Sequence, residues 1–298
     1  MIGAILGDIA GSKYEFINNR KIPDRLFMEG CFPTDDSYLT IAIMNALIAS
    51  NKYKGKDNYY EVLENEVVRY TLYSYIDAPW TAGWGGGFSH WCKNILVNNN
   101  IHNVSDLRKA NKIVYEKNKS AGNGSCMKCS AVPYFSSSLE ECEEITKLVV
   151  SITHDSYESY RGSVCLNTSI YLALSGKSKD EIKENILKYY PNVKDLSYKY
   201  LNKNYEYSEL TVNTMPASMV CFLESDSFYN ALEMAISIGG DADTLGAITG
   251  ALAESYYSKG SEPIMDILKI LNDLGYKNNN EFSSYFYESI KKAININR

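Results

Sequence analysis

Two short acidic clusters are the parts of this chain whose residue types and spacing best suit chemistry. The first is Thr34-Asp35-Asp36-Ser37, and the second is Gly239-Gly240-Asp241-Ala242-Asp243-Thr244. Each cluster precedes an apolar run with helical periodicity, so each lies at the start of a predicted helix. Helix capping and the helix dipole would by themselves explain acidic residues there. Both clusters also place a hydroxyl beside two carboxylates, and such oxygen ligands suit a shared Mg²⁺ or Mn²⁺ ion.

Four Asp carboxylates brought close together would need a divalent cation. They would repel one another and raise their own pKa values unless such an ion neutralised them. We therefore expect one ion or, better, two. An EF-hand is a poor alternative, because the fifth position of a loop that starts at Asp241 is Leu245 and the twelfth is Leu252.

Two further polar segments have both an ordinary and a functional interpretation. Glu15 follows Gly3, Gly7 and Gly11, whose spacing of four indicates close helix packing. The simplest interpretation of Glu15 itself is an ordinary surface residue. The run 120–125, Ser-Ala-Gly-Asn-Gly-Ser, predicts a turn before a helix. Free backbone N–H groups there could hold a phosphate, although an ordinary helix-start loop explains the same pattern.

An aromatic loop, a histidine and a pair of cysteines complete the candidates. Residues 80–88 combine two Trp with small residues and predict either a loop that stacks an aromatic ligand or a surface turn anchored in the core. His154 lies between two helical patterns, where a hydrogen-bonded structural role is the ordinary one. Cys126 and Cys129 have CxxC spacing, but no second pair follows at zinc-ribbon distance, so we expect core thiols.

The elements that must position these residues are helices. Apolar residues recur with the helical period over most of the chain, whereas strand-like alternation is hard to find. The expected helices cover residues 36–49, 59–75, 105–115, 139–152, 159–174, 179–189, 213–223, 227–238, 244–257, 263–274 and 281–293. The prediction is one all-α domain over residues 1–298, a compact helical bundle with a dinuclear metal site at helix N-termini. Residues 192–207 lack a sustained apolar face and are expected to form a surface excursion.

Composition excludes several classes of protein. The 298 residues are 45% hydrophobic and 22% charged, which suits a large buried core and not a disordered chain. With 30 Lys and Arg against 36 Asp and Glu, the net charge of −6 leaves no uniform positive field for a nucleic-acid backbone. No stretch reaches the roughly 20 apolar residues of a membrane span. Seven scattered cysteines favour reduced thiols in a cytoplasm.

Five segments, taken in order, resemble one known family. They are GDIAGSKYEF, TDDS, SAGNGS followed by CMKC, THDS, and GGDADTLGAITGALAE. Together they resemble the ADP-ribosylglycohydrolase family, the DraG-like hydrolases, over residues 3 to about 254. The resemblance implies an all-α orthogonal bundle with a dinuclear Mg²⁺ or Mn²⁺ centre, in agreement with the helical pattern.

On the matching positions, the resemblance implies a site in three parts. The metal ligands would be Thr34, Asp35, Asp36, Asp241, Asp243 and Thr244, with Asp243 as the bridge. Glu15 matches the family's acidic residue that closes over the metals and is assigned proton transfer, and Asp35 or Asp36 could orient the attacking water. The substrate contacts would be Ser120, Gly122, Asn123, His154 and Trp84.

The activity that the resemblance implies is hydrolysis at the anomeric carbon of ADP-ribose. The partner would be an ADP-ribosylated protein or a small ADP-ribose conjugate, and nucleic acid would enter only as a modified substrate. Ser37 stands where many members have Thr, Lys128 stands where many have Arg, and residues 80–88 resemble only a bacterial subset, so the leaving group stays open.

Two other functions fit parts of the pattern. One is a non-catalytic module of the same fold that binds ADP-ribose or a nucleotide, although such a module would be expected to lose metal ligands. The other is a dinuclear phosphoesterase, although those sites usually mix His with carboxylates, and neither acidic cluster here contains His.

Overall fold

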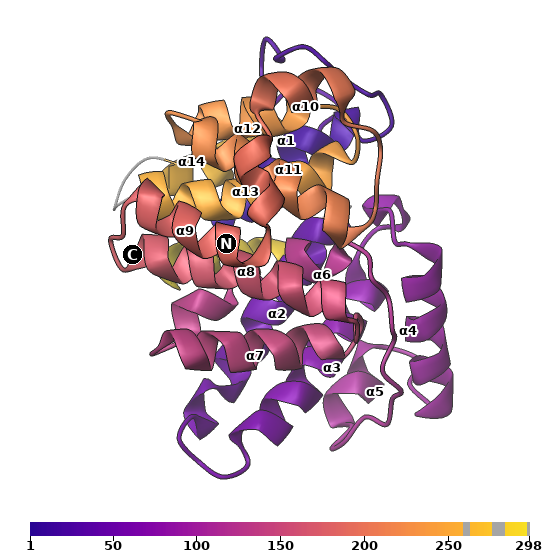
Figure 1. Ribbon diagram of the computed structural model, residues 1–298. Helices are drawn as coiled ribbons and strands as arrows, with labels where there is room; N and C mark the ends of the chain where they lie inside the picture. The colour runs from indigo at the N-terminus through magenta and orange to yellow at the C-terminus, as the bar shows by residue number, and fades with distance from the viewer. Residues whose placement is uncertain (259–262, 276–283, 297–298) are drawn as a thin grey trace.

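Helices form nearly all of the regular structure. The computed structural model describes residues 1–258, 263–275 and 284–296 (Figure 1). Within those ranges, β pairing is limited to two isolated bridges, Lys119–His154 and Gly122–Leu210. The all-α prediction is therefore confirmed. The α-helices are α1 (Ile2–Gly11), α2 (Asp35–Ser50), α3 (Tyr59–Asp77), α4 (Gly86–Asn98), α5 (Val104–Lys109), α6 (Gly124–Met127), α7 (Leu139–Ser151), α8 (Tyr157–Leu174), α9 (Lys179–Tyr189), α10 (Tyr198–Asn204), α11 (Thr211–Glu224), α12 (Phe228–Ser237), α13 (Ala242–Tyr257), α14 (Pro263–Asp273) and α15 (Ser284–Ile296).

Helices α1 and α13 pack backbone against backbone. A Cβ atom on Gly7 would lie 1.9 Å from the carbonyl oxygen of Gly246, and a Cβ on Gly3 would lie 2.2 Å from that of Gly250. Only glycine permits so close an approach. The pairing is antiparallel, since the earlier residue of α1 meets the later residue of α13. The C-terminal end of α1 therefore meets the N-terminal end of α13, where the second acidic cluster lies.

Substitution of Gly7 by Ala is expected to destabilise the protein by about 3 kcal/mol or more. The added methyl group collides with the backbone of α13, which has no side chain that could move aside. Thermal unfolding of the variant should show a clearly lower midpoint. Gly87→Ala is the matched control, because Gly87 is also helical and a Cβ there meets nothing within 4 Å. Equal midpoints for the two variants would contradict the close helix contact.

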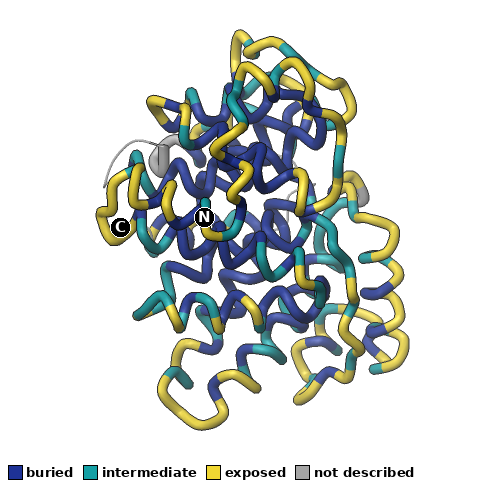
Figure 2. Tube along the Cα trace, in the orientation of Figure 1, coloured by how far each residue is buried: buried dark blue, intermediate teal, exposed yellow. Residues whose placement is uncertain are grey.

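A buried layer surrounds this helix pair. Helix α2 packs on α3 and α1, and α13 also contacts α8, α11 and α12. Figure 2 shows the buried residues gathered along the centre of the molecule, with the exposed ones in the peripheral loops and helix ends. The N-termini of α2 and α13 are thus held by rigid helices on several sides, which suits residues that must keep a fixed geometry.

The predicted helix at 105–115 is shorter than expected. Only Val104–Lys109 is helical, and the chain then runs without regular structure to residue 119. The guanidinium of Arg69 on α3 donates to the carbonyls of Leu107 and Ala110, the latter at 2.7 Å, and the backbone N–H of Ile113 donates to Asn65 at 3.1 Å. These tertiary hydrogen bonds replace the helical ones and end the helix.

The segment 192–207 is more ordered than the expected surface excursion. It contains a 3-10 turn at Pro191–Asp195 and helix α10, and the side chains of Leu201 and Tyr205 are buried. The ring of Tyr205 packs against Gly240, where a Cβ would lie 2.6 Å from it. The segment therefore forms part of the wall beside the second acidic cluster.

Other boundaries differ from the sequence predictions by smaller amounts. Helices α1, α4 and α10 were not among the expected ranges, and α4 begins inside the aromatic segment 80–88. Residues 281–283 of the predicted helix at 281–293 lie outside the described residues, and the rest of that range belongs to α15. In the part of the chain that is described, no helix combines the length and apolar character needed to cross a membrane.

All seven cysteines are buried and none forms a disulfide, as expected for core residues. Burial raises the pKa of Cys126 to about 11 and raises that of Cys129 further. A thiol with a raised pKa is a poor nucleophile near neutral pH. The prediction that the CxxC pair belongs to the core is confirmed.

Candidate functional site

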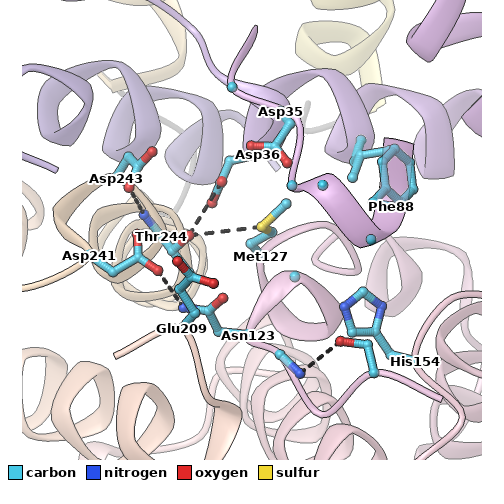
Figure 3. Close-up of a pocket in the computed structure, with 18 of the residues that line it drawn as sticks. Asp35, Asp36, Phe88, Asn123, Met127, His154, Glu209, Asp241, Asp243 and Thr244 are labelled. Carbon is cyan, nitrogen blue, oxygen red and sulfur yellow. Dashed lines mark hydrogen bonds between the residues drawn. The ribbon is translucent and has the colours of Figure 1, made fainter. Parts of the chain in front are cut away.

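Carboxylates from three separate segments converge where α1, α2 and α13 meet. Ligand oxygens of Asp8, Asp36 and Asp243 lie within 4.8 Å of one another, and so do those of Glu15, Asp241 and Asp243. Asp243 belongs to both groups, so the two groups are adjacent. Figure 3 shows Thr244, at the start of α13, beside Asp36 at the start of α2, with their hydrogen bond drawn between them. The structure thus brings the two predicted acidic clusters together.

Asp8 is the residue that α1 contributes to this acidic site, and it also caps α2. Its Oδ2 accepts hydrogen bonds from the backbone N–H groups of Thr34 (2.9 Å) and Ser37 (3.0 Å) and from the Ser37 hydroxyl. Its Oδ1 accepts one from the Thr34 hydroxyl at 2.7 Å. These are the donors that an N-cap side chain normally satisfies. Helix α1 therefore sets the position of the Thr-Asp-Asp-Ser motif.

Burial and mutual repulsion raise the pKa values of the clustered carboxyl groups. Burial and then Asp243 raise the pKa of Asp8 to about 7. Burial, followed by Asp243 and Asp8, raises the pKa of Glu15 to about 8. Burial is likewise the first cause of the raised pKa values of the other members, Asp35, Asp36, Asp241 and Asp243. Without a cation, the site therefore retains protons near neutral pH.

The donor atoms of this site fit a divalent cation. The Oδ1 atom of Asp36 is buried and has no hydrogen-bond partner among the described residues. Its Oδ2 atom accepts from the hydroxyl of Thr244 at 3.3 Å. A buried carboxylate oxygen with no partner is costly unless a proton or a cation satisfies it. All the candidate ligands are oxygens, which Mg²⁺ and Mn²⁺ prefer.

A cavity of about 400 Å³ opens onto the acidic site. Its walls combine the carboxylates with a loop, a histidine, an aromatic ring and the segment that precedes α11. The lining includes Glu15, Asp35, Asp36, Asp241, Asp243 and Thr244 on one side, and Phe88, Ser120, Gly122, Asn123, Gly124, His154, Tyr207 and Glu209 on the others. The predicted residues Ser120, Gly122, Asn123 and His154 are therefore all at the cavity, whereas Thr34 lies behind Asp36 as the N-cap of α2.

Asn123 links the loop at 120–124 to the acidic site. Its Nδ2 donates to Asp241 Oδ2 at 2.6 Å and to the Thr214 hydroxyl at 3.1 Å. Its backbone N–H donates to the carbonyl of Glu209 at 2.8 Å. The Ser120 hydroxyl accepts from the N–H of Gly122 at 3.1 Å, the contact drawn beside His154 in Figure 3. This loop is a fixed wall of the cavity.

Of the aromatic segment 80–88, Phe88 lines the cavity and the predicted Trp84 does not. Phe88 lies in the first turn of α4 and lines the cavity, whereas Trp84 does not line it. Trp84 stacks on Phe88 with ring centroids 5.3 Å apart and also contacts Tyr75 and Tyr38. The indole of Trp84 therefore supports a ring that lines the cavity, and a substrate contact by Trp84 itself stays a prediction.

Four residues of this site were missed by sequence reasoning: Asp8, Phe88, Tyr207 and Glu209. Asp8 did carry a signal, because a carboxylate within an otherwise apolar helical run must be buried with partners. Phe88 lies within the aromatic segment 80–88, which the sequence indicates as a candidate. Tyr207 and Glu209 had no local signal, since only the packing of the segment before α11 against the loop at 120–124 brings them to the cavity.

The fold and the site together define a class of protein, an all-α hydrolase with a carboxylate-rich centre at helix N-termini. Residues 1–259 match the family model described as ADP-ribosylglycohydrolase. The chain therefore belongs to the ADP-ribosylglycohydrolase family, and it is an ADP-ribosylhydrolase, a hydrolase of the glycosidase type. The resemblance found in the sequence motifs is confirmed.

Individual relatives are similar at low identity over most of their length. ADP-ribosylhydrolase ARH3 of Gallus gallus is 23% identical and aligns over 88% of this chain and 85% of its own. ADP-ribosylarginine hydrolase Tri1 of Pseudomonas putida (strain GB-1) is 24% identical over 88% of this chain and 71% of its own. A solved structure titled ADP-ribosylglycohydrolase-related protein complex has a TM-score of 0.63 at 19% identity, over 100% of this chain and 96% of that one. This structural likeness supports the fold.

Proposed function

We propose that this enzyme is a metal-dependent hydrolase that cleaves the glycosidic bond at the anomeric carbon of ADP-ribose and so releases ADP-ribose from a modified protein side chain or a small acceptor. The observation that carries the proposal is that two clusters of three carboxylates share Asp243 and lie at a cavity. Family membership indicates that the substrate contains ADP-ribose, and the clustered carboxylates indicate that the reaction depends on metal.

Two divalent cations, Mg²⁺ or Mn²⁺, are the cofactors that these residues suit. Asp8, Asp36 and Asp243 would hold one ion, and Glu15, Asp241 and Asp243 the other. Thr34, Asp35 and Thr244, which adjoin these groups in the sequence, would be further oxygen donors. Such a pair supplies electrostatic stabilisation to a glycosidic bond that breaks through an oxocarbenium-like transition state.

The remaining cavity residues bind and orient the substrate. Asn123 and the loop at 120–124 present polar groups beside the acidic site, which suits the diphosphate and distal ribose. Phe88 presents an aromatic face. Asp35 is only partly buried at the cavity surface, so its carboxylate is placed to orient a water molecule, while Glu15 holds or releases a proton.

The acceptor joined to ADP-ribose is open to a direct test. The relatives include an ADP-ribosylarginine hydrolase and an ADP-ribosyl-[dinitrogen reductase] glycohydrolase from Rhodospirillum rubrum, the latter 26% identical over 48% of this chain. A panel of ADP-ribosylated acceptors, with arginine-linked and serine-linked members, would be incubated with Mg²⁺ or Mn²⁺ and the released ADP-ribose measured by chromatography. Metal-dependent release from one acceptor establishes the reaction and its linkage. ADP-ribose binding in calorimetry without release from any acceptor would instead indicate a binding module.

Glu15→Gln is expected to lower kcat by about 100-fold while leaving cation binding by Asp8, Asp36 and Asp243 largely intact, because Glu15 is not a member of that group. The amide keeps the shape and one ligand oxygen of Glu15, but it cannot take up or give back a proton. Steady-state kinetics and Mn²⁺ calorimetry would be run side by side.

Glu206→Gln is the matched control for Glu15→Gln. Glu206 is an exposed carboxylate near the same cavity but is not part of its lining. This control should keep full activity. Full activity in Glu15→Gln as well would remove Glu15 from the mechanism.

The compartment in which the enzyme works is part of the same proposal. Seven buried cysteines without a disulfide suit a chain that folds and stays reduced, as proteins of the cytoplasm do.

A further inference from the structure

A buried lysine lies behind the wall of the cavity. The side chain of Lys128 is 2% exposed, and no carboxylate of the described residues forms an ion pair with it. Buried lysines are rare and normally paired, because an ammonium group is costly to remove from water. The partners of Lys128 are instead two neutral groups, the hydroxyl of Thr153 and Nδ1 of His154, the latter at 3.4 Å.

These contacts determine which nitrogen of His154 carries the proton. An ammonium group has three donors and no acceptor, so Thr153 Oγ1 and His154 Nδ1 must both accept from it. The Thr153 hydroxyl also lies 2.8 Å from Nδ1. Since Thr153 Oγ1 accepts from Lys128, its own hydrogen is free to point at Nδ1. By either route Nδ1 is an acceptor, and the imidazole proton must be on Nε2.

The Nε2 atom faces the cavity. A Cβ atom on Gly124 would lie 3.1 Å from Nε2, and one on Gly122 would lie 3.8 Å from it, so Nε2 borders the loop at 120–124. The ring lies beside this loop in Figure 3 and lines the cavity. None of the hydrogen bonds found among the described residues involves Nε2. Its N–H is therefore available to a bound ligand.

The charge of Lys128 also opposes a second proton on the ring. An imidazolium would direct its Nδ1–H at the ammonium group, a like-charge contact inside the protein. Burial and then Lys128 hold the pKa of His154 well below its ordinary value, and burial lowers the pKa of Lys128 itself to about 8. Glycine at position 124 is part of the arrangement, because a side chain there would cover the Nε2 face.

We propose that Lys128 is a positioning residue that, with Thr153, fixes His154 as a neutral Nε2–H donor for an acceptor oxygen of the ligand in the cavity. His154 is then a binding group and not a general base, because its unprotonated nitrogen, Nδ1, points away from the cavity and already accepts hydrogen bonds from Lys128 and Thr153. The choice of ADP-ribose as the ligand rests on the proposed function, whereas the assignment of the His154 tautomer does not depend on it.

The first measurement is nitrogen NMR of the histidine rings in the ¹⁵N-labelled full chain at pH 7.5. The chain has three histidines, and the exposed His90 and His102 serve as internal references. His154 is expected to show one neutral pattern with the proton on Nε2. In Lys128→Met, which leaves an apolar chain of similar length, the pattern should become a mixture of tautomers, because the Thr153 hydroxyl is then free to donate or accept. Lys128→Arg should retain the native pattern.

The second measurement is the affinity for ADP-ribose by calorimetry, together with steady-state kinetics if turnover is found. Lys128→Met should weaken binding about 10-fold, with KM raised and kcat nearly unchanged, since the lost contact acts on bound substrate and transition state alike. The affinity of Lys128→Arg for ADP-ribose should remain within about 2-fold of that of the native protein, because arginine keeps a hydrogen-bond donor at this position. Lys119→Met is the matched control: it removes an exposed lysine whose backbone pairs with that of His154, and it should change neither readout.

The outcomes separate this proposal from the function it builds on. A proton on Nδ1, or on both nitrogens, in the native protein would overturn it. So would weaker binding in Lys128→Met with an unchanged His154 spectrum, because the lysine would then act through its charge alone. If Lys128→Met fails to fold, Thr153→Val tests the same link and should also mix the tautomers. A native spectrum with the proton on Nε2 in a protein that releases no ADP-ribose would leave the tautomer assignment standing and reject only the proposed reaction.

Discussion

Substitution of Asp243 by Asn is expected to abolish ADP-ribose release and to remove binding of both cations. Asp243 is the one carboxylate common to the two ligand groups among the described residues, so its loss leaves each group with only two carboxylates. Metal catalysis of this kind contributes several kcal/mol to the transition state, which corresponds to a fall in kcat of roughly 10³-fold or more. Released ADP-ribose and Mn²⁺ calorimetry would be measured on the same preparation.

The Asp243→Asn variant should still fold. The side-chain oxygen of Asn can keep the hydrogen bond that Asp243 Oδ1 accepts from the backbone N–H of Thr244 at 2.9 Å. Asp180→Asn is the matched control, since Asp180 is also an acidic residue in the first turn of a helix but is exposed and remote from the cavity. Turnover within a few-fold of the native rate in Asp243→Asn, with cations still bound, would refute the shared-ligand geometry.

Without metal, the protein is expected to become less stable as the pH rises from about 4 to about 7. The pKa of Asp8 is about 7 in the folded protein against 3.8 for the unperturbed group, so the folded state binds more protons in this window and loses stability as they leave. For Asp8 alone this is about 4 kcal/mol, or of the order of 10 °C in Tm. Calorimetric unfolding in EDTA at pH 5 and pH 8 would show the lower Tm at pH 8.

A divalent cation should cancel or reverse this dependence. Bound Mg²⁺ or Mn²⁺ satisfies the ionised carboxylates and competes with protons for them, so the metal raises Tm more at pH 8 than at pH 5. Asp243→Asn is informative here too, because Asp243 is the first charge, after burial, that raises the pKa of Asp8. In EDTA at pH 8 this variant should be more stable than the native protein, and in Mn²⁺ less stable. A native Tm in EDTA that does not change between pH 5 and pH 8 would show that the carboxylates are not coupled as the structure indicates.

Much of the fold could be predicted from the sequence because helices leave local marks. Periodic apolar positions and capping residues located α2, α7, α8, α9 and α13 to within a few residues. The errors fall where contacts distant in sequence overrule the local pattern. Arg69 ends α5 early by binding the carbonyls of Leu107 and of Ala110, which follows the helix. The packing of Tyr205 on Gly240 orders a segment with no apolar face of its own.

The candidate site divides in the same way. The sequence by itself determined the two acidic helix starts, the loop at 120–124 and the glycine spacing of α1, because each pattern lies within a short stretch of the chain. Only the tertiary structure decided that Asp8 joins the cluster, that Phe88 and not Trp84 faces the cavity, and that Lys128 lies behind His154. The physical reason is that a carboxylate, a ring or an ammonium group acquires its role from the groups within a few ångströms. Here those neighbours come from backbone contact between α1 and α13 and from loops far apart along the chain.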